Sequence, residues 1–375
     1  MPTRTVSPNA VADLAHSWVS SDDGRELFDE LSAQLRKIVP FDGSAWFGTD
    51  PATVLATHPV RIENVEPGHC ESYWSREYSE EDVLLFRDLA RAESPADSLF
   101  HATDDRPARS VRYREFLQPQ GYSDEVRAAF RVGASTWGVV DLFRDASARP
   151  FSEDDVAVIR SLTPAIATAL RSFATYTRSS AGGADADGPG TALYHADGTL
   201  VSLDDQAERW FAELAGAHWR HRESPLMATV SAVVARADAV AVGRERGASM
   251  ARLRAEGGRW LTVHASSLRS TDDLPGLTVV VIEPAKSAQI APIIVEAYSL
   301  TPREREITQA LARGLTNNEI AGQLHLSAHT VRDHLKAIFS KVGVGSRGEL
   351  VAKIFADHYG PALHAIPFAQ VHTEV

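Results

Sequence analysis

Near the C-terminal end of this 375-residue chain, a hydroxyl residue stands three positions before a glutamate at three places. In such a capping box the hydroxyl accepts a hydrogen bond from the third helical N–H, and the carboxylate accepts one from the N–H of the hydroxyl residue. The three pairs are Thr301–Glu304, Thr316–Glu319 and Ser346–Glu349. Ser327 is a further helix-start candidate without the glutamate. Together these signals predict four short helices, near residues 302–313, 317–324, 328–342 and 347–357.

Helices this short are marginal in isolation, so they must share a core. Apolar residues recur at helical spacing along the first three of them. These residues are Ile307 and Leu311, then Ile320, Ala321 and Leu324, then Val331, Leu335, Ile338 and Val342. The opposite face of the third helix carries His329, Arg332, Asp333 and Lys336. A polar face with Arg and Lys, on a helix held by a partner across a three-residue turn, is what insertion into the major groove of DNA requires.

The net charge of −12 does not exclude a nucleic-acid partner. Only the surface that faces DNA needs to be basic, and residues 298–358 carry eight Lys or Arg against six Asp or Glu. Asp333 is the exception on the polar face, because its carboxylate repels phosphate unless it accepts a hydrogen bond from cytosine N4. Pairing with Lys336, one turn along the same face, is the other way to neutralise it.

The segment from Leu300-Thr-Pro-Arg-Glu-Arg-Glu-Ile307 to Ile338-Phe-Ser-Lys-Val-Gly-Val-Gly-Ser-Arg347 resembles the LuxR-type (GerE-like) helix-turn-helix regulators. The resemblance covers about one-sixth of the chain and implies that the third helix reads double-stranded DNA. It places Arg332, Asp333 and Lys336 at groove-facing positions, and Thr330 and Lys341 where contacts to the DNA backbone are typical. We add Ser327 and His329 to the expected DNA-binding set. The resemblance also implies a homodimer formed by the fourth helix, through Leu350, Val351 and Ile354.

The rest of the chain predicts two α+β domains ahead of this all-α domain. Helices enclose a strand-rich middle in residues 1–178, and a Gly-rich polar linker follows in 179–190. A smaller α+β domain occupies 191–284, a connecting helix 285–297, the helix-turn-helix domain 298–358 and a tail 359–375. The first domain resembles GAF domains, through the strand 137–143 and the helix entry 150–155. The second resembles PAS domains, through 196–201 and the helix after it. Both resemblances imply sensor modules.

Aromatic residues gather in the first domain, and two interpretations of them stay open. One is an apolar cavity with a few polar handles, as small-molecule sites often have, and its candidate lining is Trp46, Trp74, Tyr113 and Trp137. The other is an ordinary aromatic core, which is the commoner use of such residues.

No sequence pattern indicates a cofactor, a metal site or catalysis. Metal-ligand spacings, phosphate loops and nucleophile elbows are absent from the sequence, and the pair His69-Cys70 is more typical of structural or surface residues than of a haem ligand. The single cysteine, the polar N-terminus and the lack of long apolar runs predict a cytoplasmic protein without a membrane span. We therefore expect a regulator modulated by a small molecule or a partner. The alternatives are a scaffold whose helical domain docks on protein, and an enzyme acting on a bound metabolite.

Overall fold

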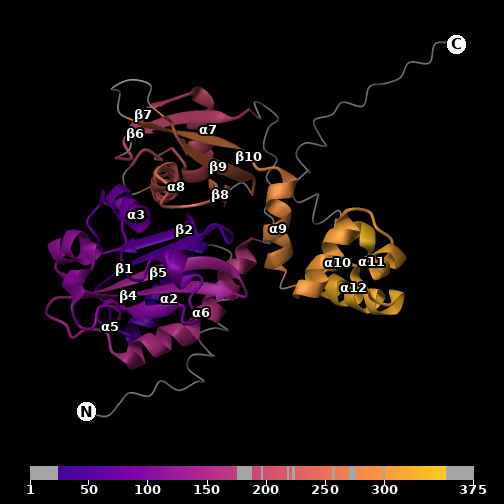
Figure 1. The fold of residues 1–375 in the computed structure, drawn as a ribbon, viewed down its shortest axis with the longest axis horizontal. Coiled ribbons are helices and arrows are strands. Elements are labelled where there is room, and N and C mark those ends of the chain that lie inside the picture. Colours follow the sequence, from indigo (N-terminus) through magenta and orange to yellow (C-terminus); the bar gives the residue numbers. More distant parts are fainter. Residues whose placement is uncertain are drawn as a thin grey trace. The chain divides into compact units, whose positions relative to one another are not determined.

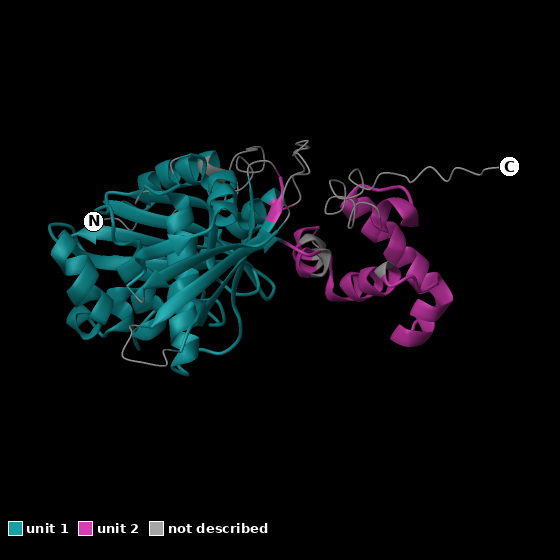
Figure 2. Ribbon diagram, turned by 90° about the horizontal axis from the view of Figure 1, so that it is seen from above, with its two compact units in different colours: residues 1–173, 188–256, 261–284 teal, residues 174–187, 257–260, 285–375 magenta. Residues whose placement is uncertain are grey.

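The computed structural model describes residues 24–174 and 188–351, apart from 196, 218, 222–223, 256–257, 270–275 and 299. The chain divides into two compact units (Figure 2). Unit 1 comprises residues 1–173, 188–256 and 261–284, and unit 2 comprises 174–187, 257–260 and 285–375. The sequence pattern also predicts a helix over 8–18; that segment, most of the predicted linker and the predicted tail lie outside the described residues.

A five-stranded antiparallel sheet forms the first half of unit 1, with the order β2-β1-β5-β4-β3 (Figure 1). Its strands are β1 (Gly43–Thr49), β2 (Ala56–Glu63), β3 (Ala96–Ser98), β4 (Tyr122–Val132) and β5 (Ser135–Asp145). Gly133, at φ 63°, makes the predicted tight turn between β4 and β5.

Helices cover both faces of this sheet, and neighbouring residues of β1 show it. Side chains alternate between faces along a strand, so Trp46 packs on Phe28 of α2 while Phe47 packs on Trp74 of α3. The remaining elements are short, apart from α6, which packs on β4 and β5. The bounds are α2 (Gly24–Ile38), α3 (Cys70–Ser79), α4 (Phe86–Leu89), α5 (Leu99–Ala102), η2 (Pro107–Arg109), η3 (Tyr113–Leu117), η4 (Gln118–Gln120) and α6 (Glu153–Phe173).

The sequence pattern also predicts one helix over 80–92, but only the four-residue helix α4 (Phe86–Leu89) forms within this range. The Asp82 carboxylate does not cap a helix there, because it accepts hydrogen bonds from the Ser110 hydroxyl and the Arg112 N–H, both at 2.8 Å. Leu84 has a left-handed backbone (φ 57°), which also stops a helix from forming. Helix α3, just before this stretch, was not predicted.

A second five-stranded sheet completes unit 1 and repeats the strand order of the first, as β7-β6-β10-β9-β8. Helix α8 is buried along most of its length and packs against α3 and β2 of the first sheet, so both sheets share one apolar core. The predicted boundaries between the domains stay predictions. The bounds are β6 (Gly190–His195), β7 (Leu200–Leu203), α7 (Asp205–Ala215), α8 (Pro225–Ala241), β8 (Ser249–Arg254), β9 (Trp260–Ser267) and β10 (Leu277–Pro284).

Unit 2 contains the predicted helices around their own small core. They are α9 (Ser287–Ala297), α10 (Pro302–Ala312), α11 (Asn317–Leu324) and α12 (Ala328–Val342), with a further helix that begins at Arg347. Every residue named above for the shared core is buried, except the half-buried Leu324. The fold class is therefore as predicted: two α+β sheet domains followed by an all-α helix-turn-helix domain. None of the helices that the structure describes is both long and apolar enough to span a membrane.

Candidate nucleic-acid interface and ligand cavity

The predicted capping boxes set the starts of α10 and α11. The Thr301 hydroxyl accepts from the Glu304 N–H at 3.3 Å, and the Glu304 carboxylate accepts from the Thr301 N–H at 2.7 Å. The same reciprocal pair forms at Thr316 and Glu319. The third box is only half formed, because the Glu349 carboxylate accepts from the Gly345 N–H at 2.8 Å, one residue earlier than expected.

The turn between α11 and α12 fixes the angle between these two helices. His325 ends α11 in the left-handed conformation (φ 53°), a role that the sequence did not reveal because glycine usually fills it. Ser327 then caps α12 by accepting from the Thr330 N–H at 3.0 Å. The hydroxyls of Ser327 and Thr330 also lie 2.8 Å apart. Both residues predicted to bind DNA at this position thus also hold the helix start.

Helix α12 has one buried and one exposed face, as predicted. Val331, Leu335, Ile338 and Val342 are buried in the core of the domain. His329, Arg332, Asp333 and Lys336 are exposed. Since this face packs on nothing within the described part of unit 2, it is free to meet a partner.

Charges on the exposed face are only loosely paired. The Asp333 carboxylate lies 3.7 Å from Lys336 Nζ and 3.8 Å from His329 Nε2, so the pairing with Lys336 is present. Exposed pairs at this distance contribute little and rearrange easily. Arg332 makes only a long contact, 3.4 Å, from Nε to the Ala328 carbonyl, and has no ion pair among the described residues. Its exposed guanidinium is available to DNA.

Other basic residues of this domain are used inside it. Lys341 Nζ lies 2.6 Å from Glu304 Oε2, so the predicted phosphate ligand is engaged by a capping carboxylate in this structure. Burial raises the pKa of Glu304, but the Lys341 ammonium and the Thr301 N–H outweigh it and hold that pKa below its ordinary value. Arg303 donates to the last carbonyl of α11, and Arg347 donates to the Leu315 carbonyl at 2.8 Å. Fewer basic side chains are therefore free to contact DNA than a count of charges suggests.

The structure describes two of the three residues that were predicted to form the dimer surface. Leu350 is completely buried in the core of its own domain, so its side chain is not available to a second chain in this structure. Val351 is half-buried and stays a candidate. Ile354 lies outside the described residues.

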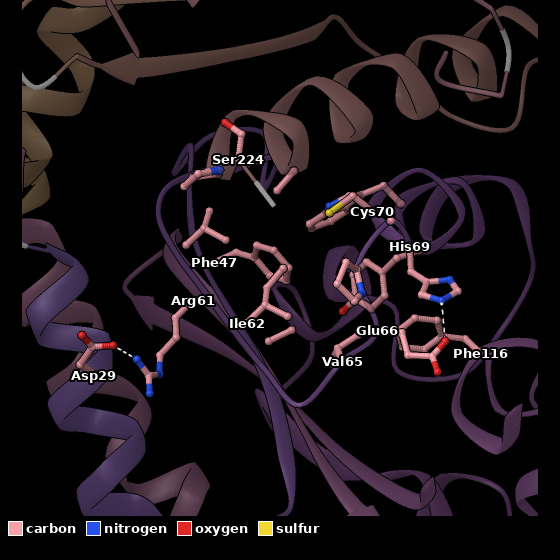
Figure 3. Close-up of a pocket in the computed structure, with 18 residues that line it drawn as sticks. Asp29, Phe47, Arg61, Ile62, Val65, Glu66, His69, Cys70, Phe116 and Ser224 are labelled. Atoms are coloured by element: carbon pink, nitrogen blue, oxygen red, sulfur yellow. Dashed lines mark ion pairs between the residues drawn. The ribbon is translucent and has the colours of Figure 1, made fainter. Parts of the chain in front are cut away.

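A cavity of about 440 Å³ lies in unit 1 against the face of the first sheet that α3 covers (Figure 3). Of the four aromatic residues predicted to line a ligand site, only Trp74 does so. Trp46 is buried on the other face of the sheet, where its Nε1 donates to Ser44 Oγ at 3.0 Å. Trp137 is buried and Tyr113 half-buried, and neither lines the cavity. None of these three residues therefore lines this cavity, and which aromatic residues bind a ligand stays a prediction.

Residues other than the four predicted ones also line the cavity. They include His69 and Cys70, together with Phe47, Tyr73 and Phe116. No group of three potential metal ligands occurs in the parts of the chain that the structure describes, so His69 and Cys70 are cavity walls here. Only the aromatic richness of the first domain pointed toward this site.

Below the cavity, Tyr73 reaches a buried network of charges in the first sheet. Its hydroxyl donates to Asp141 Oδ2 at 3.0 Å. Arg127 is fully buried and lies 2.9 Å from Glu77 Oε2 and 3.3 Å from Asp141 Oδ2. Burial, and then the charge of Glu125, raise the pKa of Asp141 well above its ordinary value. This network is part of the interior and is not exposed to a partner.

Residues 298–354 match the model of the family "Bacterial regulatory proteins, luxR family" (GerE). The probable transcriptional regulatory protein SgaR of Hyphomicrobium methylovorum is 50% identical over 54 residues, which are 14% of this chain and 26% of that protein. The transcriptional regulatory protein ComA of Bacillus subtilis is 46% identical over 69 residues, which are 18% of this chain and 30% of that protein. The chain thus matches less than a third of the length of these relatives. Its C-terminal domain is a LuxR-family helix-turn-helix domain.

Two solved structures were also compared with the whole chain. SdiA in complex with octanoyl-rac-glycerol is 12% identical, covers 96% of this chain and 97% of its own, and has a TM-score of 0.31. The phage VqmA-DPO complex is 22% identical, covers 50% of this chain and 88% of its own, and has a TM-score of 0.25.

Proposed function

We propose that this chain is a transcriptional regulator that binds double-stranded DNA through α12. The observation that carries the proposal is the exposed face of this helix. It offers Arg332 and Lys336 while the opposite face is anchored in the domain core. Arg addresses guanine O6 and N7 with two hydrogen bonds, and Lys meets guanine or a phosphate. The match of residues 298–354 to a family of bacterial regulators supports the same conclusion.

The regulator acts as a homodimer in this proposal, with each chain reading one half-site. Twofold symmetry of the protein then requires a nearly palindromic operator. The other proposed DNA contacts are Ser327, His329, Thr330, Asp333 and Lys341. The proposed dimer surface includes Val351 and Ile354.

The role of unit 1 is to sense a small molecule and not to catalyse a reaction. Its cavity of about 440 Å³ has the size of small-molecule sites, and its lining combines apolar and polar side chains. The relatives of the C-terminal domain are named as regulators, which supports a non-enzymatic role. We place this activity in the cytoplasm, where bacterial DNA lies and where a lone thiol stays reduced.

In vitro selection tests the DNA-binding proposal without a known operator. The full chain is incubated with random duplexes at low salt, and the retained sequences are amplified over several rounds. We expect one inverted-repeat motif to be enriched, with a half-site spacing near one helical turn or a multiple of it. Retention of no duplex even at low salt would contradict the proposal and favour a protein-docking role for the helical domain.

A further inference from the structure

Five charged side chains meet in the interior of the first sheet domain, and we call them the buried charge cluster. They are Glu77 of α3, Arg112 just before η3, Glu125 and Arg127 of β4, and Asp141 of β5. None of them is more than 3% exposed. If every acid were ionised, three carboxylates would face two guanidinium groups. The cluster would then bury one uncompensated negative charge, which is costly.

Two acids of this region have a donor for each of their oxygens. Glu77 Oε1 accepts a hydrogen bond from the Phe86 N–H at 2.5 Å, and Glu77 Oε2 accepts one from Arg127 at 2.9 Å. Asp82, beside the cluster, accepts three hydrogen bonds through its two oxygens, each at 2.8 Å. Donors of this kind favour the charged form of a carboxyl group. Neither acid has an oxygen left to satisfy.

Glu125 and Asp141 differ, because each has one satisfied and one unsatisfied oxygen. Glu125 Oε1 accepts two hydrogen bonds from Arg112, one of them at 2.8 Å. Asp141 Oδ2 accepts one from the Tyr73 hydroxyl at 3.0 Å and lies 3.3 Å from Arg127 Nε. The other two oxygens, Glu125 Oε2 and Asp141 Oδ1, are buried without a hydrogen-bond partner. Buried acceptors left in this way are destabilising unless a donor lies between them.

The strand register brings these two carboxyl groups together. Arg127 of β4 stands opposite Asp141 of β5, and Glu125 stands opposite Phe143. Glu125 and Asp141 are therefore diagonal neighbours on one face of the sheet, within reach of long side chains. Burial, then the charge of Glu125, and also a hydrogen bond between the two side chains raise the pKa of Asp141. A hydrogen bond between two carboxyl groups requires one proton.

We propose that Glu125 and Asp141 form a buried proton-binding site that holds one shared proton at neutral pH. The proton is bonded to one of the two unsatisfied oxygens and donated to the other, so both gain a partner. The cluster then carries two negative charges, one on Glu77 and one on the pair, against the guanidinium groups of Arg112 and Arg127. The shared proton therefore balances the cluster, and the site is independent of DNA binding.

Such a site makes the stability of unit 1 depend on pH. The ordinary pKa of an aspartate is about 3.9, and that of the folded Asp141 lies well above it. The stabilisation by the proton is fully present below the unfolded pKa and is lost as pH rises through the folded one. Loss of the proton leaves three carboxylates against two guanidinium groups, so β4 and β5 should loosen at alkaline pH.

Infrared spectroscopy of the full chain in D₂O detects the proton directly. The carbonyl stretch of a protonated carboxyl lies above the amide I band, whereas ionised carboxylates absorb below it. We expect this band at mildly alkaline pD, and Asp141→Asn should remove it. Asp124→Asn is the matched control: burial raises the pKa of Asp124 to about 7, so this residue is ionised at that pD and its substitution should leave the band in place.

Amide substitutions test whether the two acids share a single proton. The amide introduced by Asp141→Asn or by Glu125→Gln supplies an N–H in place of the proton. Each single variant should therefore unfold at a denaturant concentration close to that of the wild type. The double variant places two amides against each other and removes the negative charge of the pair. Its unfolding midpoint should fall much further than the sum of the single effects.

The wild-type spectrum tests the inference even if a substitution prevents folding. Absence of the protonated carboxyl band from the wild type would overturn the inference, and so would its persistence in Asp141→Asn. Additive effects of the two amide substitutions would also contradict a shared proton. Because no DNA is present, none of these results bears on the proposed regulator.

Discussion

Unit 1 buries some of its charged side chains in its interior, whereas unit 2 exposes charged side chains on α12. In unit 1, Arg127 and Asp141 are completely buried and face one another. In unit 2, Arg332 is exposed and the Lys336 side chain is 78% exposed, with only loose pairing. A buried charge must be satisfied by the protein itself and therefore stabilises one arrangement of the chain. An exposed charge contributes little to stability and remains free to bind a partner.

The largest effect should follow from removing one member of the buried network. Arg127→Met leaves Glu77 and Asp141 without their cation, and breaking such a pair costs about 3–5 kcal/mol. Hydrogen–deuterium exchange of the full chain should show faster exchange in β4 and β5, with α10–α12 unchanged. Arg332→Ala is the control, and its effect on stability should stay within about 0.5 kcal/mol. Equal effects of the two variants on exchange would contradict the claim that only the buried charges stabilise the fold.

The exposed face should show the reverse pattern, with a large effect on binding. Arg332→Ala should weaken binding to the selected duplex by about 1–3 kcal/mol, and Lys336→Ala should reduce the salt slope by about 1 if it meets a phosphate. Fluorescence anisotropy over a series of salt concentrations measures both. Arg220→Ala, which removes an exposed positive charge from unit 1, should leave affinity nearly unchanged. A loss in the control as large as in Arg332→Ala would mean that only net charge matters.

A smaller effect should come from Glu304, which is charged but mostly buried and belongs to the core of unit 2. Its pKa lies below the ordinary value, so ionised Glu304 stabilises the folded domain. This stabilisation is present above the unfolded pKa of about 4.3 and is lost as pH falls through the lower folded value. Glu304→Gln should lower the free energy of unfolding by about 1 kcal/mol at neutral pH. The loss of stability at acid pH should also be smaller than in the wild type. Denaturant unfolding, monitored by hydrogen exchange in α10, measures both. An unaltered acid profile would argue against the pair with Lys341.

The smallest effect should follow Asp333→Asn. The change removes the only acid from the exposed face and frees Lys336, so affinity for unselected duplex should rise by a factor of about two to five. Folding stability should not change measurably. If affinity fell for the selected duplex but not for unselected duplex, Asp333 would instead contact a base.

The helix-turn-helix domain could be predicted from sequence because its signals are local. The boxes at Thr301 and Thr316 lie within one helical turn, and the spacing of Val331 and Leu335 marks the buried face directly. What escaped prediction depends on contacts across the fold. The pair Lys341–Glu304 joins residues far apart in sequence, and the left-handed His325 stands where glycine more often ends a helix.

The cavity could not be predicted in the same way. Trp46 and Trp74 are both buried aromatic residues of the first domain, and only the sheet register and the position of α3 separate them. Three lining residues, Ser224, Pro225 and Ala228, also stand at the start of α8, which packs against α3 from a distant part of the sequence. The burial of Arg127 and Asp141 could not be predicted either. A charged residue in a strand gives no sign of its burial until its partners are known.

A structure of the full chain bound to the selected duplex shows which face of α12 meets DNA. We expect α12 in the major groove, with Arg332 and Lys336 within hydrogen-bond distance of base edges or phosphates and with Val331 and Leu335 still in the domain core. Finding the exposed side of α12 turned away from the duplex, or covered by protein, would contradict this expectation.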